Sequence, residues 1–250
     1  MAKVLEVCVD GVESAVRAAQ GGATRLELCA GLVTGGITPD ETLFGMVRER
    51  VSLPARVLLR PRCGDFLYRE EEFALLRRQV RRYADLGADW VVIGVLRADG
   101  AFDEPRMAAL IDETRGRCGV TLHRAFDLCR DPFAALDAAE RLGVDTILTA
   151  GQAARCSDGV VLLRALIAQA DKAQILVGAG VDAAAIRTLA PATGADAFHL
   201  SAKRIEPSGM AFRREGVPMG LPGLSEFEVW RCDSDAVRKA RQALDACCGA

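Results

Sequence analysis

The chain has 250 residues, of which 50% are hydrophobic and 26% are charged. This length and apolar content are enough for a large core, which excludes an intrinsically disordered chain. The 32 Lys and Arg nearly balance the 34 Asp and Glu, which excludes a surface built to neutralise nucleic acid phosphates or an anionic membrane. No apolar run approaches the roughly 18 residues of a membrane span, and Glu6 and Asp10 interrupt the first apolar run where a signal peptide would be uninterrupted. We therefore expect a cytoplasmic protein that binds neither nucleic acid nor membrane.

Short apolar runs alternate with longer segments of helical period along most of the chain. Strands are predicted to start at Val4, Arg25, Ala55, Trp90, Val120, Thr146, Gln174 and Ala197. A doubly wound sheet also alternates strands with helices, but its first turn usually carries a GxGxxG motif. Here that turn reads CVDGVES. Eight strands with helices between them instead predict an α/β fold of the (β/α)8 TIM barrel class, formed by one domain over residues 1–250.

The segment after the eighth predicted strand differs from the rest of the chain. Residues 203–227 contain Pro and Gly and have weak periodicity, which predicts an irregular loop or arm. This arm would lie on the catalytic face or reach a neighbouring subunit. A last helix is predicted over residues 232–248, with the adjacent thiols Cys247 and Cys248 at its end.

Polar residues recur at the carboxyl ends of the predicted strands, where barrels of this class build their active sites. Glu6 and Cys8 share one face of the first strand, and Glu27 and Cys29 repeat the pattern in the second. The later strand ends contribute Arg60, Arg62, His123, Arg124, Asp127, His199 and Ser201. These residues either form an ion-pair network that only fixes the barrel, or they line a functional pocket. We favour the pocket, because polar groups at strand ends gather in sites.

One chemistry that fits such a pocket is the capture of a small anionic metabolite by an enzyme. Arg60 and Arg62 would bind a carboxylate or phosphate in bidentate fashion. His123 would act as the general acid or base, with Glu6 or Glu27 as its carboxylate partner or as the base itself. Asp127 is a further candidate catalytic residue. The remaining candidates for binding the anion or substrate are Arg124, Gly178, Gly180, His199 and Ser201.

The other chemistry is the binding of a soft metal ion. Cys8 and Cys29 occupy matching positions in adjacent predicted strands, which lie about 4.8 Å apart. Two thiolates at this separation suit Cu(I). Two such cysteines also occur as plain core residues, so the spacing alone leaves both possibilities open. Cys247 and Cys248 form a second, weaker thiol pair.

Several segments, taken in chain order, resemble the CutC family of copper homeostasis proteins. They are LEVCVD, ATRLELCA with the following GGITP, RPRCGDF, HRAFD, ILTAGQ, VGAGV and HLSA, and MAFRREG resembles the family's tail. The resemblance spans roughly residues 4–202. It implies a (β/α)8 barrel, a cytoplasmic location, a homo-oligomer, which we take to be a dimer, and copper binding. It also implies that Cys8, Cys29, Cys129 and Asp65 are residues that members of the family share, whereas Cys63 and Ala150 depart from the family pattern.

Two hypotheses therefore follow from the sequence. The first is a cytoplasmic copper homeostasis protein that binds Cu(I) through Cys8 and Cys29. The second is a barrel enzyme of unknown reaction that acts on a small phosphorylated or carboxylated metabolite. A dedicated copper carrier usually has a CxxC pair or a Met-rich run, and this sequence has neither, which keeps the second hypothesis open.

Overall fold

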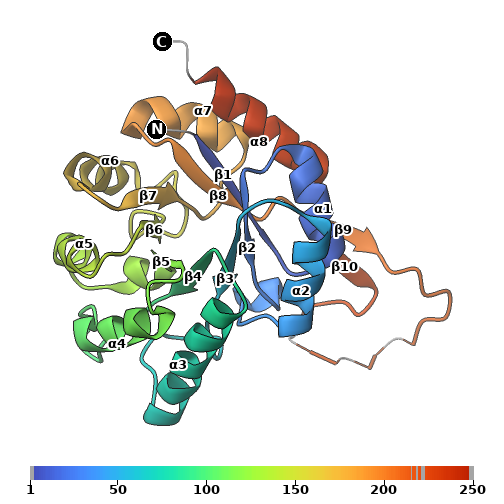
Figure 1. The fold of residues 1–250 in the computed structure, drawn as a ribbon. Coiled ribbons are helices and arrows are strands. Elements are labelled where there is room, and N and C mark those ends of the chain that lie inside the picture. Colours follow the sequence, from blue (N-terminus) through green and yellow to red (C-terminus); the bar gives the residue numbers. More distant parts are fainter. Residues whose placement is uncertain (1–2, 215, 218, 221–222, 248–250) are drawn as a thin grey trace.

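A computed structural model describes residues 3–214, 216–217, 219–220 and 223–247. Eight parallel strands pair in sequence order and close into a barrel, with the helices around it (Figure 1). The strands are β1 (Val4–Val9), β2 (Arg25–Leu28), β3 (Ala55–Leu58), β4 (Trp90–Ile93), β5 (Gly119–Leu122), β6 (Thr146–Thr149), β7 (Gln174–Val177) and β8 (Ala197–Leu200). All eight predicted strands are present, so the (β/α)8 barrel prediction is confirmed.

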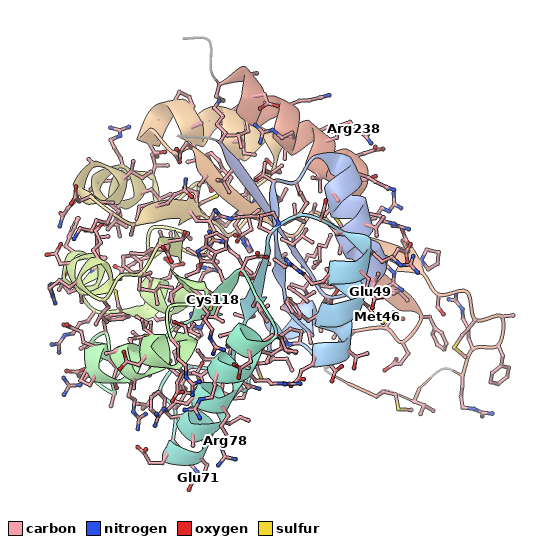
Figure 2. All side chains as sticks on the ribbon, viewed as in Figure 1. Met46, Glu49, Glu71, Arg78, Cys118 and Arg238 are labelled. Carbon is pink, nitrogen blue, oxygen red and sulfur yellow. The ribbon has the colours of Figure 1, made fainter. Side chains whose placement is uncertain are left out.

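The helices cover the outer face of the barrel. They are α1 (Val12–Gly21), α2 (Glu41–Arg50), α3 (Glu70–Asp85), α4 (Glu104–Thr114), α5 (Pro132–Arg141), α6 (Val160–Gln169), α7 (Ala183–Thr193) and α8 (Ser234–Ala246), with short 3-10 turns η1 (Leu32–Thr34) and η2 (Arg124–Leu128). In α3, Phe73, Leu76 and Val80 recur at the spacing that buries one face. Figure 2 shows Glu71 and Arg78 of the same helix pointing away from the barrel. Within the described residues, no helix is long and apolar enough to cross a membrane.

Alternation along each strand separates two kinds of interior. In β1, Leu5, Val7 and Val9 are fully buried and belong to the main apolar core between the barrel and its helices. The residues between them, Glu6 and Cys8, therefore point into the barrel, because successive side chains of a strand face opposite sides. The barrel interior of this protein is thus partly polar, whereas branched apolar side chains usually fill it.

Trp90 lies inside the barrel near the amino-terminal ends of the strands. A Cβ atom on Gly119 would lie 1.9 Å from Trp90 Nε1, so the indole occupies the space that glycine leaves open. The Arg56 guanidinium stacks on this ring, with Cζ 4.7 Å from its centroid. A glycine is therefore needed at residue 119 for an aromatic side chain to fill this end of the barrel.

The segment after β8 differs from the sequence prediction. Residues 203–227 were predicted to be irregular, but β9 (Lys203–Pro207) pairs with β10 (Glu228–Cys232) as an antiparallel two-stranded sheet. The described residues between these strands project from the barrel as an arm (Figure 1). Helix α8 begins at Ser234 rather than at residue 232, because the Asp233 side chain accepts hydrogen bonds from the first backbone N–H groups of the helix. Cys248 lies outside the described residues.

Candidate functional site

A cavity of about 350 Å³ opens at the carboxyl ends of the barrel strands. Active sites of this fold class occupy the same end. Predicted site residues that line it are Cys8, Glu27, Cys29, Arg60, His123, Arg124, Gly180, His199 and Ser201. The cavity therefore brings together most of the polar residues that the strand ends contribute.

Cys8, Glu27 and His199 form a compact cluster on one wall of this cavity. A Cys8 sulfur, a Glu27 carboxylate oxygen and a His199 ring nitrogen all lie within 4.8 Å of one another. They come from the three consecutive strands β1, β2 and β8, because β1 pairs with both of the others. Cys8 is the direct strand neighbour of Glu27, and His199 is the direct neighbour of Glu6. The cluster is thus positioned by backbone pairing rather than by mobile loops.

Cys29 does not lie opposite Cys8, contrary to the sequence prediction. The residue that faces Cys8 across β1 and β2 is Glu27, because neighbouring strands of a closed barrel are staggered along the barrel axis. The Cys29 sulfur lies 3.6 Å from the Val9 carbonyl oxygen, and burial raises the pKa of its thiol. Cys29 lines the cavity but is outside the cluster that Cys8 forms.

Glu6 is fully buried beneath the cluster and is surrounded by positive charge. Its Oε2 accepts a hydrogen bond from Arg25 Nε at 2.6 Å and lies 3.3 Å from Arg56 Nε. Its Oε1 lies 2.8 Å from Nδ1 of His199. Burial opposes ionisation of Glu6, but these cations lower its pKa to about 2. Glu6 is therefore a carboxylate, and its contact leaves the other ring nitrogen of His199 to face Cys8 and Glu27.

Glu27 is the carboxyl group of the cluster, and His199 is its neighbouring counter-charge. Burial raises the pKa of Glu27 to about 7, although the His199 charge opposes this shift, and the nearby charge of Glu6 adds to it. Oε2 of Glu27 has no hydrogen-bond partner within the described residues. Burial also lowers the pKa of His199, but Glu27, Cys8 and Glu6 together raise it well above the usual histidine value. The three cluster side chains and Glu6 thus form one interacting electrostatic unit.

His123 occupies a different part of the cavity and does not pair with Glu6. Its Nδ1 accepts a hydrogen bond from the Ala125 backbone N–H at 3.1 Å. Burial, together with the Arg60 charge, lowers the pKa of His123 to about 3. The ring is therefore neutral with its proton on Nε2, because Nδ1 serves as the acceptor. His123 was predicted to act as an acid or base with a glutamate partner. In the structure Glu6 contacts His199 instead.

Arg60 is held beside His123 by backbone carbonyl groups. Its terminal nitrogens donate to the carbonyl oxygens of Gly36 at 3.1 Å and Gly64 at 2.6 Å. Its guanidinium carbon lies 5.0 Å from the centre of the Phe66 ring, and that ring lies 4.7 Å from the His123 ring. Phe66 is therefore a shared surface that keeps the arginine and the histidine together.

Comparisons with known proteins decide the family. The sequence model described as the CutC family matches residues 3–204. The chain belongs to the CutC family. A CutC family protein of Vibrio vulnificus strain YJ016 is 39% identical over 246 residues, which cover 98% of both chains. A human protein named copper homeostasis protein cutC homolog is 40% identical over 238 residues, covering 94% of this chain and 86% of the relative. The CutC crystal structure from Streptococcus agalactiae matches with a TM-score of 0.75 and 26% identity, covering 80% of this chain and 98% of that one.

Besides Glu6, which lies beneath the cluster, three residues predicted for the site do not line the cavity of this CutC protein. The Arg62 guanidinium donates to Glu72 at 2.6 Å and to Asp65 at 2.8 Å, so it is engaged outside the cavity. Strand alternation no longer applies to Arg62, because β3 ends at Leu58. The paired arginine clamp expected from Arg60 and Arg62 is therefore not formed. Gly178 also lies off the cavity, although Gly180 lines it.

Asp127 is the third such residue, and it connects two segments of the fold. It accepts hydrogen bonds from Thr149 Oγ1 at 2.5 Å and from the backbone N–H of Gln152 at 3.0 Å. It also pairs with Arg124 Nε at 2.7 Å. The carboxylate thus attaches η2 to the end of β6. Asp127 therefore makes these contacts outside the cavity, whereas Arg124 lines it.

Sequence reasoning missed Arg25, Arg56 and Phe66. Arg25 and Arg56 are buried inside the barrel of this CutC protein, where they neutralise Glu6. Strand alternation would have found both. Arg25 shares one face of β2 with the inward Glu27, and Arg56 faces inward because it is next to the outward Val57 in β3. Phe66 lies in a loop, and no pattern in the sequence indicates its contacts.

Proposed function

We propose that this protein binds Cu(I) through Cys8 and His199, with Glu27 beside them, and acts in copper homeostasis in the cytoplasm. The observation that carries the proposal is the convergence of these three side chains within 4.8 Å. The name of the human relative, copper homeostasis protein, supports the choice of metal. The eight cysteines in the described part of the chain are all free, in keeping with a reducing compartment.

The donor set fits copper by its softness. Thiolate is the preferred ligand of Cu(I), and imidazole is a common second one. The Glu6 carboxylate holds His199 by its Nδ1 at 2.8 Å, and Nε2 would bind the metal after it loses the proton that the raised pKa keeps on the ring. Glu27 would accept the proton that the Cys8 thiol must release when it becomes a ligand. Each group thus has a separate role in binding the ion.

We expect the Cys8→Ser variant to bind Cu(I) at least about 100-fold more weakly, because it loses the only thiolate of the cluster. The measurement is an anaerobic titration of Cu(I) against a competing chelator. Cys118→Ser is the matched control, because Cys118 lies beside the start of β5, at the opposite end of the barrel. Its affinity should equal that of the parent protein.

Cys29→Ser tests the ligand pair that the sequence favoured. The stagger of β1 and β2 leads us to expect at most a small loss of affinity in this variant. A loss equal to that of Cys8→Ser would mean that the two thiolates hold the ion together. Binding that survives in a Cys8→Ser, Cys29→Ser double variant would exclude the cavity as the copper site.

We also propose that the protein is a homodimer held together by its arm. Apolar side chains are exposed on β9 and on this arm; they are Ile205, Met210, Phe212, Val217, Met219 and Leu224. Clustered apolar exposure of this kind is typical of an interface. A second copy is the simplest occupant, since closed two-fold dimers are the commonest assemblies.

Sedimentation equilibrium should give twice the chain mass of 26.7 kDa for the parent protein. Phe212→Asp should shift it to the monomer, because a charge would be buried at the interface. Val161→Asp is the control, since Val161 is 86% exposed on α6, away from the arm. A Phe212→Asp variant that stays dimeric would place the interface elsewhere.

A further inference from the structure

The cavity is much larger than a metal ion needs. Its volume of about 350 Å³ lies in the range of sites that hold small organic molecules. The Cys8, Glu27 and His199 cluster occupies the wall formed by β8, β1 and β2. Arg60 and His123 follow β3 and β5 and form another part of the lining. This second part has polar groups that the metal proposal does not use.

Two buried donors in this part of the cavity have no protein partner. Within the described residues, neither Nε of Arg60 nor Nε2 of His123 makes a hydrogen bond. The two residues are only 8% and 4% exposed. Buried donors are normally paired with an acceptor, so two unpaired ones in the same cavity indicate a ligand. Both side chains rest on the Phe66 ring, which holds them in place before the ligand arrives.

The chemistry of the two groups restricts the ligand. The Arg60 guanidinium is a permanent cation and only donates hydrogen bonds. His123 accepts from the Ala125 backbone at Nδ1, so its Nε2 carries the proton and also donates. The ligand must therefore present acceptor oxygens with negative charge. Arg124 also lines the cavity, with its Nε paired to Asp127 at 2.7 Å.

We propose that the cavity binds a small organic oxyanion, a carboxylate or a phosphate monoester, whose charged group lies against Arg60 and His123. Phosphate and carboxylate share the chemistry that arginine recognises. The rest of the ligand extends towards Cys8, Glu27 and His199. This site stands independently of copper, because its donors are not part of the metal cluster.

The test is calorimetric titration of malonate and of inorganic phosphate into metal-free protein, stripped with a chelator and then dialysed into Tris chloride. At least one of the two anions should bind, and which one binds identifies the class of acid. His123→Asn should weaken binding about 10- to 100-fold, because it removes one donor to a charged group. Its side-chain oxygen still serves the Ala125 N–H, as asparagine does at the start of helical turns.

Two arginines two residues apart supply the matched comparison. Arg60→Lys should weaken the binding of the anion by a similar factor, whereas Arg62→Lys should leave it unchanged, since Arg62 is engaged by Glu72 outside the cavity. The anion should bind although the metal has been stripped, which separates this proposal from the copper proposal. The inference is overturned if neither anion binds, or if His123→Asn binds as tightly as the parent protein.

Discussion

A Glu6→Gln variant is expected to lose about 3–5 kcal/mol of unfolding free energy. The substitution keeps the size of the side chain but leaves Arg25, Arg56 and His199 as buried positive groups without their carboxylate. Removing one member of a buried charge network costs this much, because the remaining charges lose their compensation inside the protein. Equilibrium unfolding in urea measures the loss.

Glu41→Gln is the control for this variant. Glu41 also pairs with an arginine, Arg82, but its side chain is 45% exposed. Exposed ion pairs contribute between about 0 and 1 kcal/mol, so this variant should resemble the parent protein. Equal stability of the two variants would mean that water or another group compensates the buried cations. In that case Glu6 would not be the centre of the barrel's charge network.

Glu27→Gln is expected to stabilise the protein at pH 8, by about 3 kcal/mol. Burial raises the pKa of Glu27 from 4.5 to about 7 in the folded protein. Between pH 4.5 and 7 the folded chain therefore keeps a proton that the unfolded chain has lost, so stability falls as pH rises through this window. Above pH 7 the loss of stability that results from ionising Glu27 no longer changes with pH. Glutamine has no proton to lose and avoids this loss of stability.

Urea unfolding of both proteins at pH 4 and pH 8 measures this effect. The gain should disappear at pH 4, where Glu27 is neutral in the folded and the unfolded chain. Glu113→Gln is the contrast, because Glu113 is also buried but pairs with Arg77 and Arg81, which lower the pKa of its carboxyl group. That variant should lose stability at pH 8. A Glu27→Gln variant that is less stable at pH 8 would show that Glu27 is stabilised by His199.

The two glutamates show how the barrel divides stability and function. Glu6 is satisfied by three partners, so it fixes His199 and the floor of the cavity. Glu27 has an oxygen without a hydrogen-bond partner among the described residues, and burial raises its pKa. Proteins keep such unfavourable groups mainly where function needs them. The electrostatics of the barrel therefore support Glu27, rather than Glu6, as the carboxylate that acts on a bound ligand.

The sequence by itself determined the barrel and the family. Alternating apolar runs predict eight strands, and strand starts such as Val4 and Ala197 agree with the structure because side-chain periodicity follows directly from backbone geometry. The same periodicity places Cys8, Glu27 and His199 at strand ends, where this fold class has its active site. These are local properties, and local properties can be deduced from one sequence.

Only the tertiary structure decided which of these side chains meet. The stagger between β1 and β2 sets Cys8 against Glu27 rather than Cys29, and the shear of a closed barrel, which produces this stagger, cannot be deduced from one strand's own sequence. Arg60 and Arg62 are two residues apart, yet only Arg60 reaches the cavity. Both follow the end of β3, where the rule that residues two apart share one face no longer holds. The arm's strand pairing joins residues 203–207 to 228–232 across a long loop. Contacts between segments distant in sequence depend on the closed barrel, and this is why they required the structure.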